Sequence, residues 1–568
     1  MRRSVLCLMT ATMLLGSVPP VSEVMPTARF DANFLNFPRG WTVSTGKGIT
    51  IVVVESGAAV PVAGAAAPFA VDAVALIKRL APDARVERTS LADFLGAGPL
   101  LAEKTAPKAP APDVILLMTR QLPADRAAAL RSIERLSGRG ASIVVPAWFG
   151  PMENAADDDP RIVFVREASA RGAVIVGAHG RAYQIGSLDF WKKMPVDTFA
   201  LHEGIDGDDY SGPDALLDRP LESPAPYAAA AVALLKSVET GLRPALVKEK
   251  LRENGRRVIW TRIRFAGEDG KARDWVLPAM SRAACDRRLR AWGEPKPEVG
   301  ERFAASSLDV SLLLGLPPLA GGEWSRAVLR AAEARRKATG KGVTVAILDH
   351  MFDEKDPLMA GQWVKPGSVI EGLPAFGESG HGTWMAHDLI AVAPAVQVMP
   401  VRICGPGHDG AARDYAAGID YAVAHGAKII SLSHRAVEPG EKAILDAAVD
   451  RATRAGATFV FIHYQGNRPE VVVPCPIEFA AYHEDRATVF VIGTNFTDDG
   501  SFPYTWGLSQ TAPMVAGVAA MMLEVNPALT PVRIKEILSG AGRDIGSGHT
   551  VLDAAMAVKN CAVAGATR

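Results

Sequence analysis

Thr45–Gly57 reads TGKGITIVVVESG, and nearly the same sequence returns at Thr339–Met351 as TGKGVTVAILDHM. In both stretches a glycine-containing turn precedes a short apolar run, a pattern that predicts a buried strand. The apolar run ends at Glu55 in the first stretch and at Asp349 in the second. We therefore expect one structural unit to occur twice in the chain, with an acidic side chain at the end of its first strand.

The repeat extends well beyond this strand. APYAAAAVALLKSVETGLRPALVKEKL, from Ala225, aligns without a gap with APMVAGVAAMMLEVNPALTPVRIKEIL, from Ala512. Two shorter matches lie between the ends: LAPDARV (80–86) with VAPAVQV (392–398), and GASIVV (140–145) with GAKIIS (426–431). Four matches in the same order indicate a duplication, and a period this long indicates tandem domains rather than a solenoid.

Within each copy, apolar runs typical of strands alternate with helical patterns. In the second copy the expected strands are Val343–Leu348, Ala427–Ser433, Thr458–His463 and Thr488–Gly493. The expected helices are Asp414–Ala424 and Glu441–Ala455. Continuous apolar strands that alternate with helices predict a mostly parallel sheet covered on both faces. The expected fold class is therefore α/β, with two tandem three-layer α/β/α domains whose ligands bind beyond the carboxyl ends of the strands.

The composition is that of a folded protein with more than one domain. Hydrophobic residues make up 48% of the 568 residues and charged residues 22%, which excludes a disordered chain. The formal net charge is zero and no basic stripe occurs, so we expect no nucleic-acid partner. The expected organisation is an N-terminal signal peptide, a first domain, a Pro- and Gly-rich linker and a second domain, at residues 1–28, 29–292, 293–324 and 325–568.

The N-terminus has the pattern of an export signal. Met1-Arg2-Arg3 precedes an apolar run from Ser4 to Gly16 and a Pro-containing exit, which is typical of a secretory signal peptide with an uncertain cleavage point. An anchor or a buried first helix is the alternative. No later segment looks apolar for long enough to cross a bilayer. We therefore expect a periplasmic or secreted protein without a stable membrane span.

The sequence does not decide whether the cysteines form disulfides. Loss of the signal leaves four of them, an even number in an oxidising compartment: Cys285, Cys404, Cys475 and Cys561. Their spacing contains no CxxC pair, so a zinc site built on cysteines is not expected, and the sequence does not give a disulfide pairing. Burial as small hydrophobic side chains is the alternative role.

Three side chains of the second copy have the chemistry of a nucleophilic site. Asp349 ends a strand, while His381 in SGHGTWMAHDL and Ser509 in WGLSQTAPMVAG each begin a helical pattern. A serine hydroxyl needs an imidazole to take its proton, and the imidazole needs a carboxylate to fix its tautomer. A helix N-terminus at Ser509 favours the negative charge of an oxyanion, and Asn467 in HYQGN offers a further donor. Taken singly, His381 also fits a solvated loop histidine and Ser509 an N-cap.

These motifs, in the order Asp, His, Gly-Asn and Ser, resemble the subtilisin-like serine peptidases, or subtilases. The resemblance covers about Ala338 to Val558. It implies a parallel-sheet α/β fold and hydrolysis of polypeptide substrates through an acyl-enzyme, with no cofactor required for the chemistry. By motif, the resemblance implies that Asp349 is the orienting acid and His381 the general base. It likewise implies that Ser509 is the nucleophile and Asn467 the oxyanion donor.

The same resemblance implies where substrate binds and where this chain departs from the family. Ser433 in ISLSH matches the strand that pairs with substrate backbone, and Gly466 is expected beside it. The family prefers glycine after Ser-Leu, whereas this chain has His434 and Arg435 after Ser433. These side chains would narrow the groove or contact an acidic substrate, which predicts narrow specificity. An Arg435 that points to solvent is the alternative.

Further departures flank the triad. The usual Asp-Thr-Gly or Asp-Ser-Gly is Asp349-His350-Met351 here, and the usual Gly-Thr-Ser-Met-Ala has Leu508 before the serine and Gln510-Thr511 after it. Subtilases often bind calcium, but DDGS (498–501) and ADDDP (156–160) are too short to assign a site, so the metal ligands stay unknown.

The first copy lacks the chemistry of the second. In the two registers above, Glu222 faces Ser509 and Phe69 faces His381, so neither a nucleophile nor a base is present. Only Glu55 keeps a carboxylate. We expect a catalytically inactive first domain that packs against an active second one. The alternative is a peptide-binding or scaffold protein in which neither domain is a catalyst.

Overall fold

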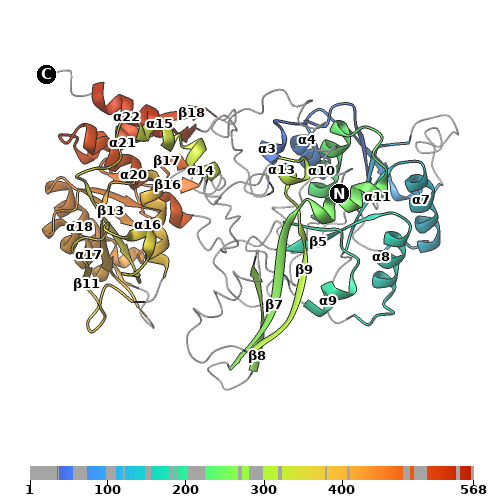
Figure 1. The fold of residues 1–568 in the computed structure, drawn as a ribbon, viewed down its shortest axis with the longest axis horizontal. Helices are drawn as coiled ribbons and strands as arrows, with labels where there is room; N and C mark the ends of the chain where they lie inside the picture. The colour runs from blue at the N-terminus through green and yellow to red at the C-terminus, as the bar shows by residue number, and fades with distance from the viewer. Residues whose placement is uncertain are drawn as a thin grey trace. The chain divides into compact units, whose positions relative to one another are not determined.

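The computed structural model describes two compact units, one formed by described residues up to 316 and the other by those from 323 onward (Figure 1). The described residues are 35, 37–55, 73–96, 111–118, 122–147, 155–179, 185, 188–201, 224–266, 272–279, 298–316, 323–377, 380–405, 410–476, 487–491, 508–544 and 550–563. Several expectations lie outside them: the signal peptide, Phe69, Glu222, Cys285 and the DDGS segment.

A nine-stranded sheet forms the centre of the first unit, in the order β2-β1-β3-β4-β5-β6-β9-β7-β8. Its first six strands are parallel, and β7 pairs antiparallel with both β8 and β9. The strands are β1 (Thr50–Glu55), β2 (Arg85–Ser90), β3 (Val114–Met118), β4 (Ser142–Pro146), β5 (Val174–His179), β6 (Thr198–Leu201), β7 (Arg256–Ala266), β8 (Ala272–Ala279) and β9 (Glu298–Ser307). The helices are α3 (Phe37–Gly40), α4 (Ala73–Leu80), α5 (Leu91–Phe94), α7 (Arg126–Gly138), α8 (Pro160–Ala170), α9 (Leu188–Lys193), α10 (Ala225–Val238), α11 (Pro244–Glu253) and α13 (Val310–Leu313).

A six-stranded parallel sheet forms the centre of the second unit, in the order β11-β12-β10-β13-β14-β15. Its strands are β10 (Thr344–Asp349), β11 (Gly367–Ser368), β12 (Gln397–Arg402), β13 (Ile429–Leu432), β14 (Thr458–Phe461) and β15 (Val471–Val472). Two small sheets add β16 (Pro474–Pro476) with β17 (Val489–Val491) and β18 (Gly542–Asp544) with β19 (Thr550–Leu552). The helices are α14 (Glu323–Val328), α15 (Ala331–Arg335), η3 (Pro357–Met359), α16 (His381–Val392), α17 (Ala412–Ala424), η4 (Pro439–Glu441), α18 (Lys442–Arg454), α20 (Leu508–Val525), α21 (Pro531–Gly540) and α22 (Ala554–Val563).

Helices cover both faces of the second unit's sheet, which gives the expected three layers (Figure 1). α17 and α18 pack on one face, and α16 and α20 pack on the other. The core is mostly apolar: β10, β13 and β14 bury every residue except Thr344, and only three of the buried residues are polar, Asp349, Ser431 and Thr458. A sheet buried on both faces explains why its strands are continuous apolar runs rather than alternating ones. The α/β fold class is confirmed.

The two units share the order of four neighbouring strands, β2-β1-β3-β4 in one and β12-β10-β13-β14 in the other. The pairing register matches the sequence repeat at its start, because Thr50 pairs with Arg85 and Thr344 pairs with Gln397. Gly46 and Gly340, the second residues of the two TGKG turns, have φ values of 83° and 81°. A left-handed backbone of this kind favours glycine, which explains why both turns keep it.

One sequence match joins strands at different positions in their sheets. GASIVV contributes to β4, which pairs with β3, whereas GAKIIS contributes to β13, which pairs with β10. By strand order, β4 corresponds to β14 and not to β13. The two segments look alike because each contains a glycine with positive φ, Gly140 or Gly426, that ends a helix just before a buried strand. Gly456 has the same place before β14, so this local pattern does not distinguish β13 from β14.

Most of the segment predicted as a linker is folded. Within 293–324, β9 pairs with β7 over most of its length and α13 packs against α3, so both belong to the first unit. Of the glycines in this segment, Gly300 lies within β9 and Gly315 follows the C-cap of α13. In Figure 1, β7, β8 and β9 extend from the first unit as a long arm.

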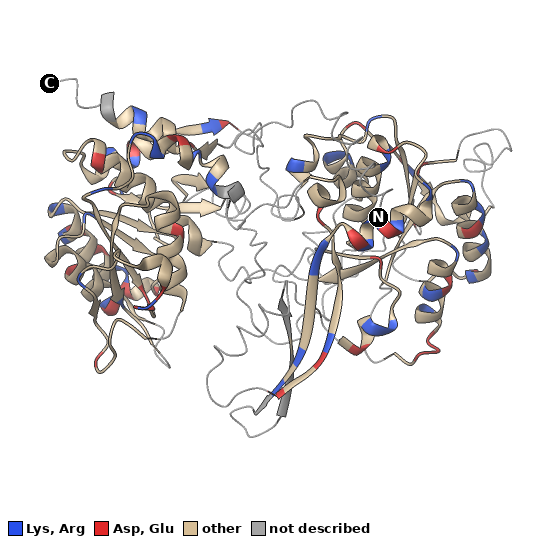
Figure 2. Cartoon of the chain, viewed as in Figure 1, with Lys and Arg blue, Asp and Glu red and all other residues tan. Residues whose placement is uncertain are grey.

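Several smaller expectations can be compared with the structure. Cys404, Cys475 and Cys561 are buried, which fits the small-hydrophobic role. Of the ADDDP acids, Asp159 caps α8 and pairs with Arg161, as expected of a helix cap rather than a calcium ligand. Figure 2 shows both signs of charge interspersed on the helices of each unit.

The expectation about apolar segments needs a correction. α20 is the one helix among the described residues that is long and apolar enough to cross a membrane. The sequence predicts a helix of small residues here, and 78% of that segment is buried inside the protein, as in the core helix of a globular domain.

Candidate active site

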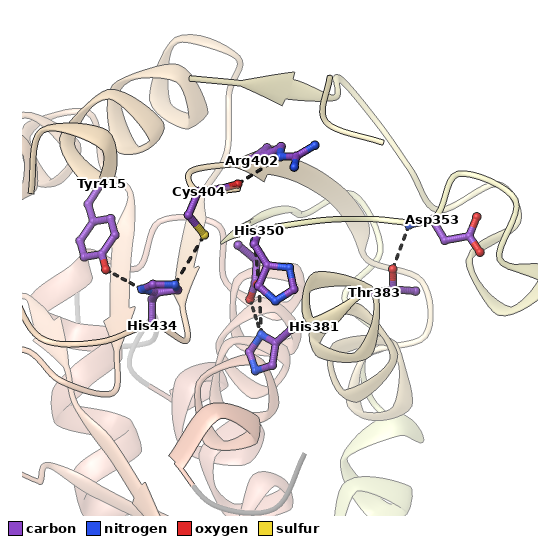
Figure 3. Close-up of polar contacts among 9 residues, drawn as sticks. His350, Asp353, His381, Thr383, Arg402, Cys404, Tyr415 and His434 are labelled. Atoms are coloured by element: carbon purple, nitrogen blue, oxygen red, sulfur yellow. Dashed lines mark hydrogen bonds and ion pairs between the residues drawn. The ribbon is translucent and has the colours of Figure 1, made fainter. Parts of the chain in front are cut away.

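Asp349 and His381 form a buried acid–base pair in the second unit. Asp349 is the last residue of β10 and is fully buried, and His381 is the first residue of α16. The His381 Nδ1 atom lies 2.8 Å from Asp349 Oδ2 and 3.0 Å from Oδ1. A carboxylate accepts at this position, so Nδ1 carries the proton and Nε2 is left as the basic nitrogen. Figure 3 shows the His381 ring with its two contacts to the acid.

The local sequence explains how the pair is held. The backbone N–H of His350 donates to Asp349 Oδ1 at 2.8 Å, which fixes the carboxylate from its other side. α16 begins without a side-chain cap at Gly380, and its second residue is Gly382. A Cβ atom at Gly382 would lie 2.8 Å from the Met351 carbonyl oxygen. Glycine is therefore needed for α16 to approach the end of β10 this closely.

Ser509 begins α20 at the same edge of the sheet. Leu348 of β10 pairs with Leu432 of β13, so Asp349 and Ser433 end neighbouring parallel strands. The Ser433 hydroxyl donates to the Ser509 backbone carbonyl at 2.6 Å, which brings the start of α20 to that edge. Among the described residues, the hydrogen bonds of His381 go to Asp349 alone, so the contact between Ser509 and the imidazole stays a prediction.

Helix packing places the starts of α16 and α20 on one side. Gly517, in the middle of α20, lies against the end of α16, where an added Cβ would come within 2.9 Å of Val392. The two helices run along each other and both begin beyond the carboxyl ends of parallel strands. His381 and Ser509 therefore both stand at the start of a helix, where backbone N–H groups favour negative charge.

The electrostatics of the pair suit a general base. Burial raises the pKa of Asp349, but the charges of His381 and His350 and their hydrogen bonds outweigh it and hold that pKa below its usual value. Burial lowers the pKa of His381, but the Asp349 carboxylate outweighs this and holds the pKa above its usual value. Such an imidazole is a stronger base than a free one.

The side chain of Asn467 makes its hydrogen bond with Lys535 of α21. It is exposed on the connection from β14 to β15, next to Gly466, which has φ of 118°. Its Oδ1 atom accepts a hydrogen bond from Lys535 Nζ of α21 at 3.2 Å. No hydrogen bond of the described residues joins it to Ser509, so the role of oxyanion donor and the place of Gly466 in the groove remain predictions.

His434 and Arg435 follow Ser433 as bulky residues with defined contacts. His434 Nδ1 lies 2.6 Å from the Tyr415 hydroxyl, and His434 Nε2 lies 3.5 Å from the Cys404 Sγ atom (Figure 3). Burial lowers the pKa of His434, so the ring is neutral around pH 7. Arg435 is exposed and donates to the Gly410 carbonyl at 3.2 Å. The His434 ring is thus fixed where a glycine would leave space.

Two buried polar residues of α16 and α20 have no role in the sequence analysis. Gln510 follows Ser509, is fully buried, and among the described residues neither of its amide atoms has a hydrogen-bond partner. Asp388 lies two turns beyond His381 in α16, and burial raises its pKa to about 7 against the opposing effect of Arg326 and His381. The sequence signal for Asp388 is a lone carboxylate in the helix α16, and the signal for Gln510 is its departure from the family pattern.

Comparison with known proteins identifies the family of the second unit. Residues 340–472 match the family model described as the Subtilase family, and this match lies wholly within the second unit. The second unit is subtilisin-like. Subtilisin BL of Lederbergia lenta is 26% identical over 247 residues, which are 38% of this chain and 89% of that protein. Alkaline serine exoprotease A of Vibrio alginolyticus is 25% identical over 223 residues, which are 35% of this chain and 42% of that protein.

A solved structure is similar to the chain as well. A protease from Pseudoalteromonas arctica PAMC 21717 has 23% sequence identity and a TM-score of 0.35, over 41% of this chain and 94% of that one. The family match to the subtilisin-like unit includes Asp349 and His381 and ends before Ser509. The resemblance inferred from the sequence motifs is therefore confirmed for the second unit.

Proposed function

We propose that this protein is a serine endopeptidase whose chemistry takes place in the subtilisin-like second unit. One observation carries the proposal. Asp349 is fully buried and holds His381 by two hydrogen bonds, at the sheet edge where α20 begins with Ser509. A buried carboxylate that orients an imidazole beside a serine at a helix start is the arrangement needed for acyl transfer.

In the proposed reaction, Ser509 Oγ attacks the carbonyl carbon of the scissile peptide bond. His381 Nε2 takes the hydroxyl proton as the new C–O bond forms, and Asp349 stabilises the resulting imidazolium. The negative oxygen develops near the Ser509 N–H at the start of α20, where the helix dipole favours it. The imidazolium then gives its proton to the leaving amine, and a water molecule activated by the same base hydrolyses the acyl-enzyme.

We further propose that the peptidase has narrow specificity. His434 stands directly after the strand β13 residues that would pair with substrate, and Tyr415 and Cys404 hold its ring in place. In the full chain, His434→Gly should accept bulkier peptides, while Arg435→Gly, which removes an exposed side chain that contacts Gly410, should change the cleavage pattern less. A peptide library cut identically by wild type and His434→Gly would refute this part of the proposal.

The first unit is proposed to be an inactive copy of the same fold. The shared strand order and the matching registers at Thr50 and Thr344 support a duplication. At the position that corresponds to Asp349, Glu55 pairs with the Arg88 side chain at 3.1 Å. A guanidinium stays protonated near neutral pH, so Arg88 cannot take the place of the imidazole as the general base. The signal-like N-terminus supports export, and packing of the two units on each other is part of the proposal.

The alternative function is a peptide-binding pseudopeptidase. It is favoured by the side chain of His434 at the groove and by the lack of a described hydrogen bond between Ser509 and His381. The deciding experiment labels the full chain with a serine-directed fluorophosphonate. We expect wild type and Ser539→Ala, which changes an exposed serine of α21, to be labelled, and Ser509→Ala not to be labelled. A wild-type chain that takes no label would favour the binding protein.

A further inference from the structure

His350 adds a second imidazole to the acid–base pair. Its Nε2 atom lies 3.9 Å from Asp349 Oδ1, and its ring centroid lies 5.6 Å from that of His381. One ligand atom from each of Asp349, His350 and His381 can be chosen so that all three lie within 4.8 Å of one another. Figure 3 shows the His350 and His381 rings side by side.

The three groups match the ligand chemistry of a borderline divalent metal. Two imidazoles and a carboxylate are a common ligand set for Zn²⁺, at about 2.0–2.2 Å from the ion. Two ligands of a tetrahedral ion are then about 3.4 Å apart. Asp349 Oδ1 lies 3.0 Å from His381 Nδ1 and 3.9 Å from His350 Nε2, on either side of this value, so small side-chain movements would close the site.

The site is also open to an ion from solution. The His350 side chain is 40% exposed and that of His381 is 20% exposed, while the acid beneath them is fully buried. A fourth coordination position therefore faces the solvent side, where water would complete the tetrahedron. An entry path and a ligand set of the correct type are both present.

We propose that Asp349, His350 and His381 form a Zn²⁺ site that reversibly blocks the catalytic base. This inference rests on the proposed peptidase function, because the ion would act on the same pair. Zn²⁺ would bind the lone pair of His381 Nδ1, and the proton now on Nδ1 would move to Nε2. The imidazole stays neutral, but Nε2 then carries a hydrogen and cannot accept the proton of Ser509.

The binding test does not depend on activity. In full-length Ser509→Ala protein, Co²⁺ as a spectroscopic probe and Zn²⁺ by calorimetry should bind at one site. The second substitution His350→Gln should weaken this binding by at least about tenfold, since it removes one of three ligands. His387→Gln should not, because His387 lies on the same helix but pairs with Asp356. Cys404→Ser should not either, which separates this site from the contact of Cys404 with His434.

The activity test uses the wild-type chain. Zn²⁺ should inhibit peptide cleavage, a chelator should restore it, and His350→Gln should need at least about tenfold more Zn²⁺ for half inhibition. Equal Zn²⁺ affinity with and without His350, or binding lost in Cys404→Ser, would overturn the proposal. A protein that binds Co²⁺ through His350 but cleaves no peptide would keep the metal site and refute the peptidase, so the two failures are distinguishable.

Discussion

The Ser433 hydroxyl donates a 2.6 Å hydrogen bond to the backbone carbonyl of Ser509. In a regular helix that carbonyl would accept from the N–H four residues later, but this residue is Pro513, which has none. The end of β13 therefore supplies the donor that α20 lacks, and the bond holds the start of the helix against the strand edge.

Ser433→Ala should loosen this connection. We expect a loss of about 0.5–1.5 kcal/mol in the free energy of unfolding, the usual net value of one hydrogen bond. The rate of fluorophosphonate labelling should fall too, because the Ser509 backbone is no longer fixed. Urea unfolding and labelling kinetics measure the two effects, with the exposed Ser539→Ala as control. Unchanged labelling in Ser433→Ala would show that the bond does not position the nucleophile.

Asp349→Asn tests whether the Asp349 charge raises the pKa of His381. The Asp349 charge raises the pKa of His381, so its removal should move the acidic limb of the kcat/KM profile to lower pH. The maximum should fall roughly 10⁴-fold, as for the same change in another serine protease, because the imidazole no longer keeps the active tautomer. If the acidic limb of the profile does not move in Asp349→Asn, a group other than His381 determines that limb.

The same substitution has a defined pH dependence in stability. The folded pKa of Asp349 is lowered, so its contribution is present above about pH 3.9 and is lost as the pH falls through the folded value. The folded pKa of His381 is raised, so its contribution is lost as the pH rises from about 6.5 through the folded value. Wild type and Asp349→Asn should therefore differ most in the free energy of unfolding between about pH 4 and 6.5.

The elements that the sequence predicted well depend on local signals. The expected helices 414–424 and 441–455 lie within two residues of α17 and α18, and the strand expected at 343–348 is β10 shifted by one residue. Glycine turns and continuous apolar runs mark these ends without help from distant residues. The pairing of Asp349 with His381 followed from motif order, since both groups end or begin elements at one sheet edge.

The parts that the sequence missed depend on contacts between distant segments. β14 and β15 run parallel with only nine residues between them, so Asn467 lies on the returning connection and meets Lys535. The Cys404–His434–Tyr415 contacts join three segments that no local pattern connects. The sequence around β9 predicts a linker because Pro and Gly cluster there and β9 itself, which is mostly exposed, has no apolar run. Its pairing with β7 decides its structure.

Asp388→Asn should reverse a pH-dependent loss of stability. Burial raises the pKa of the Asp388 carboxyl to about 7, so the folded state holds a proton that the unfolded state releases near pH 3.9. The stability contribution of this carboxyl is complete below about pH 3.9 and is lost as the pH rises to about 7. The asparagine variant should gain on wild type across this range. Urea midpoints at several pH values would measure the gain, and a difference independent of pH would contradict the shifted carboxyl.

Gln510→Met tests a buried amide beside the nucleophile. Gln510 is fully buried and its amide atoms have no hydrogen-bond partner within the part of the chain that the structure describes, and an unsatisfied buried polar group costs about 1–3 kcal/mol. Methionine has a similar length and no such group, so we expect the free energy of unfolding to rise by about this amount. Thermal and urea unfolding measure it, and a loss of stability would show that the amide has a partner in the folded protein.

The labelling rate of the same variant separates two reasons for keeping an unpaired amide at this position. If Gln510 only fills space in the core, Gln510→Met should be more stable and should react with fluorophosphonate as fast as wild type. If the amide takes part in the reaction, stability should rise while labelling and kcat/KM fall together, because a free donor next to Ser509 would find its acceptor only when the oxyanion forms. We expect the second outcome. Full activity in a stabilised Gln510→Met protein would refute it and leave the amide as a structural cost alone.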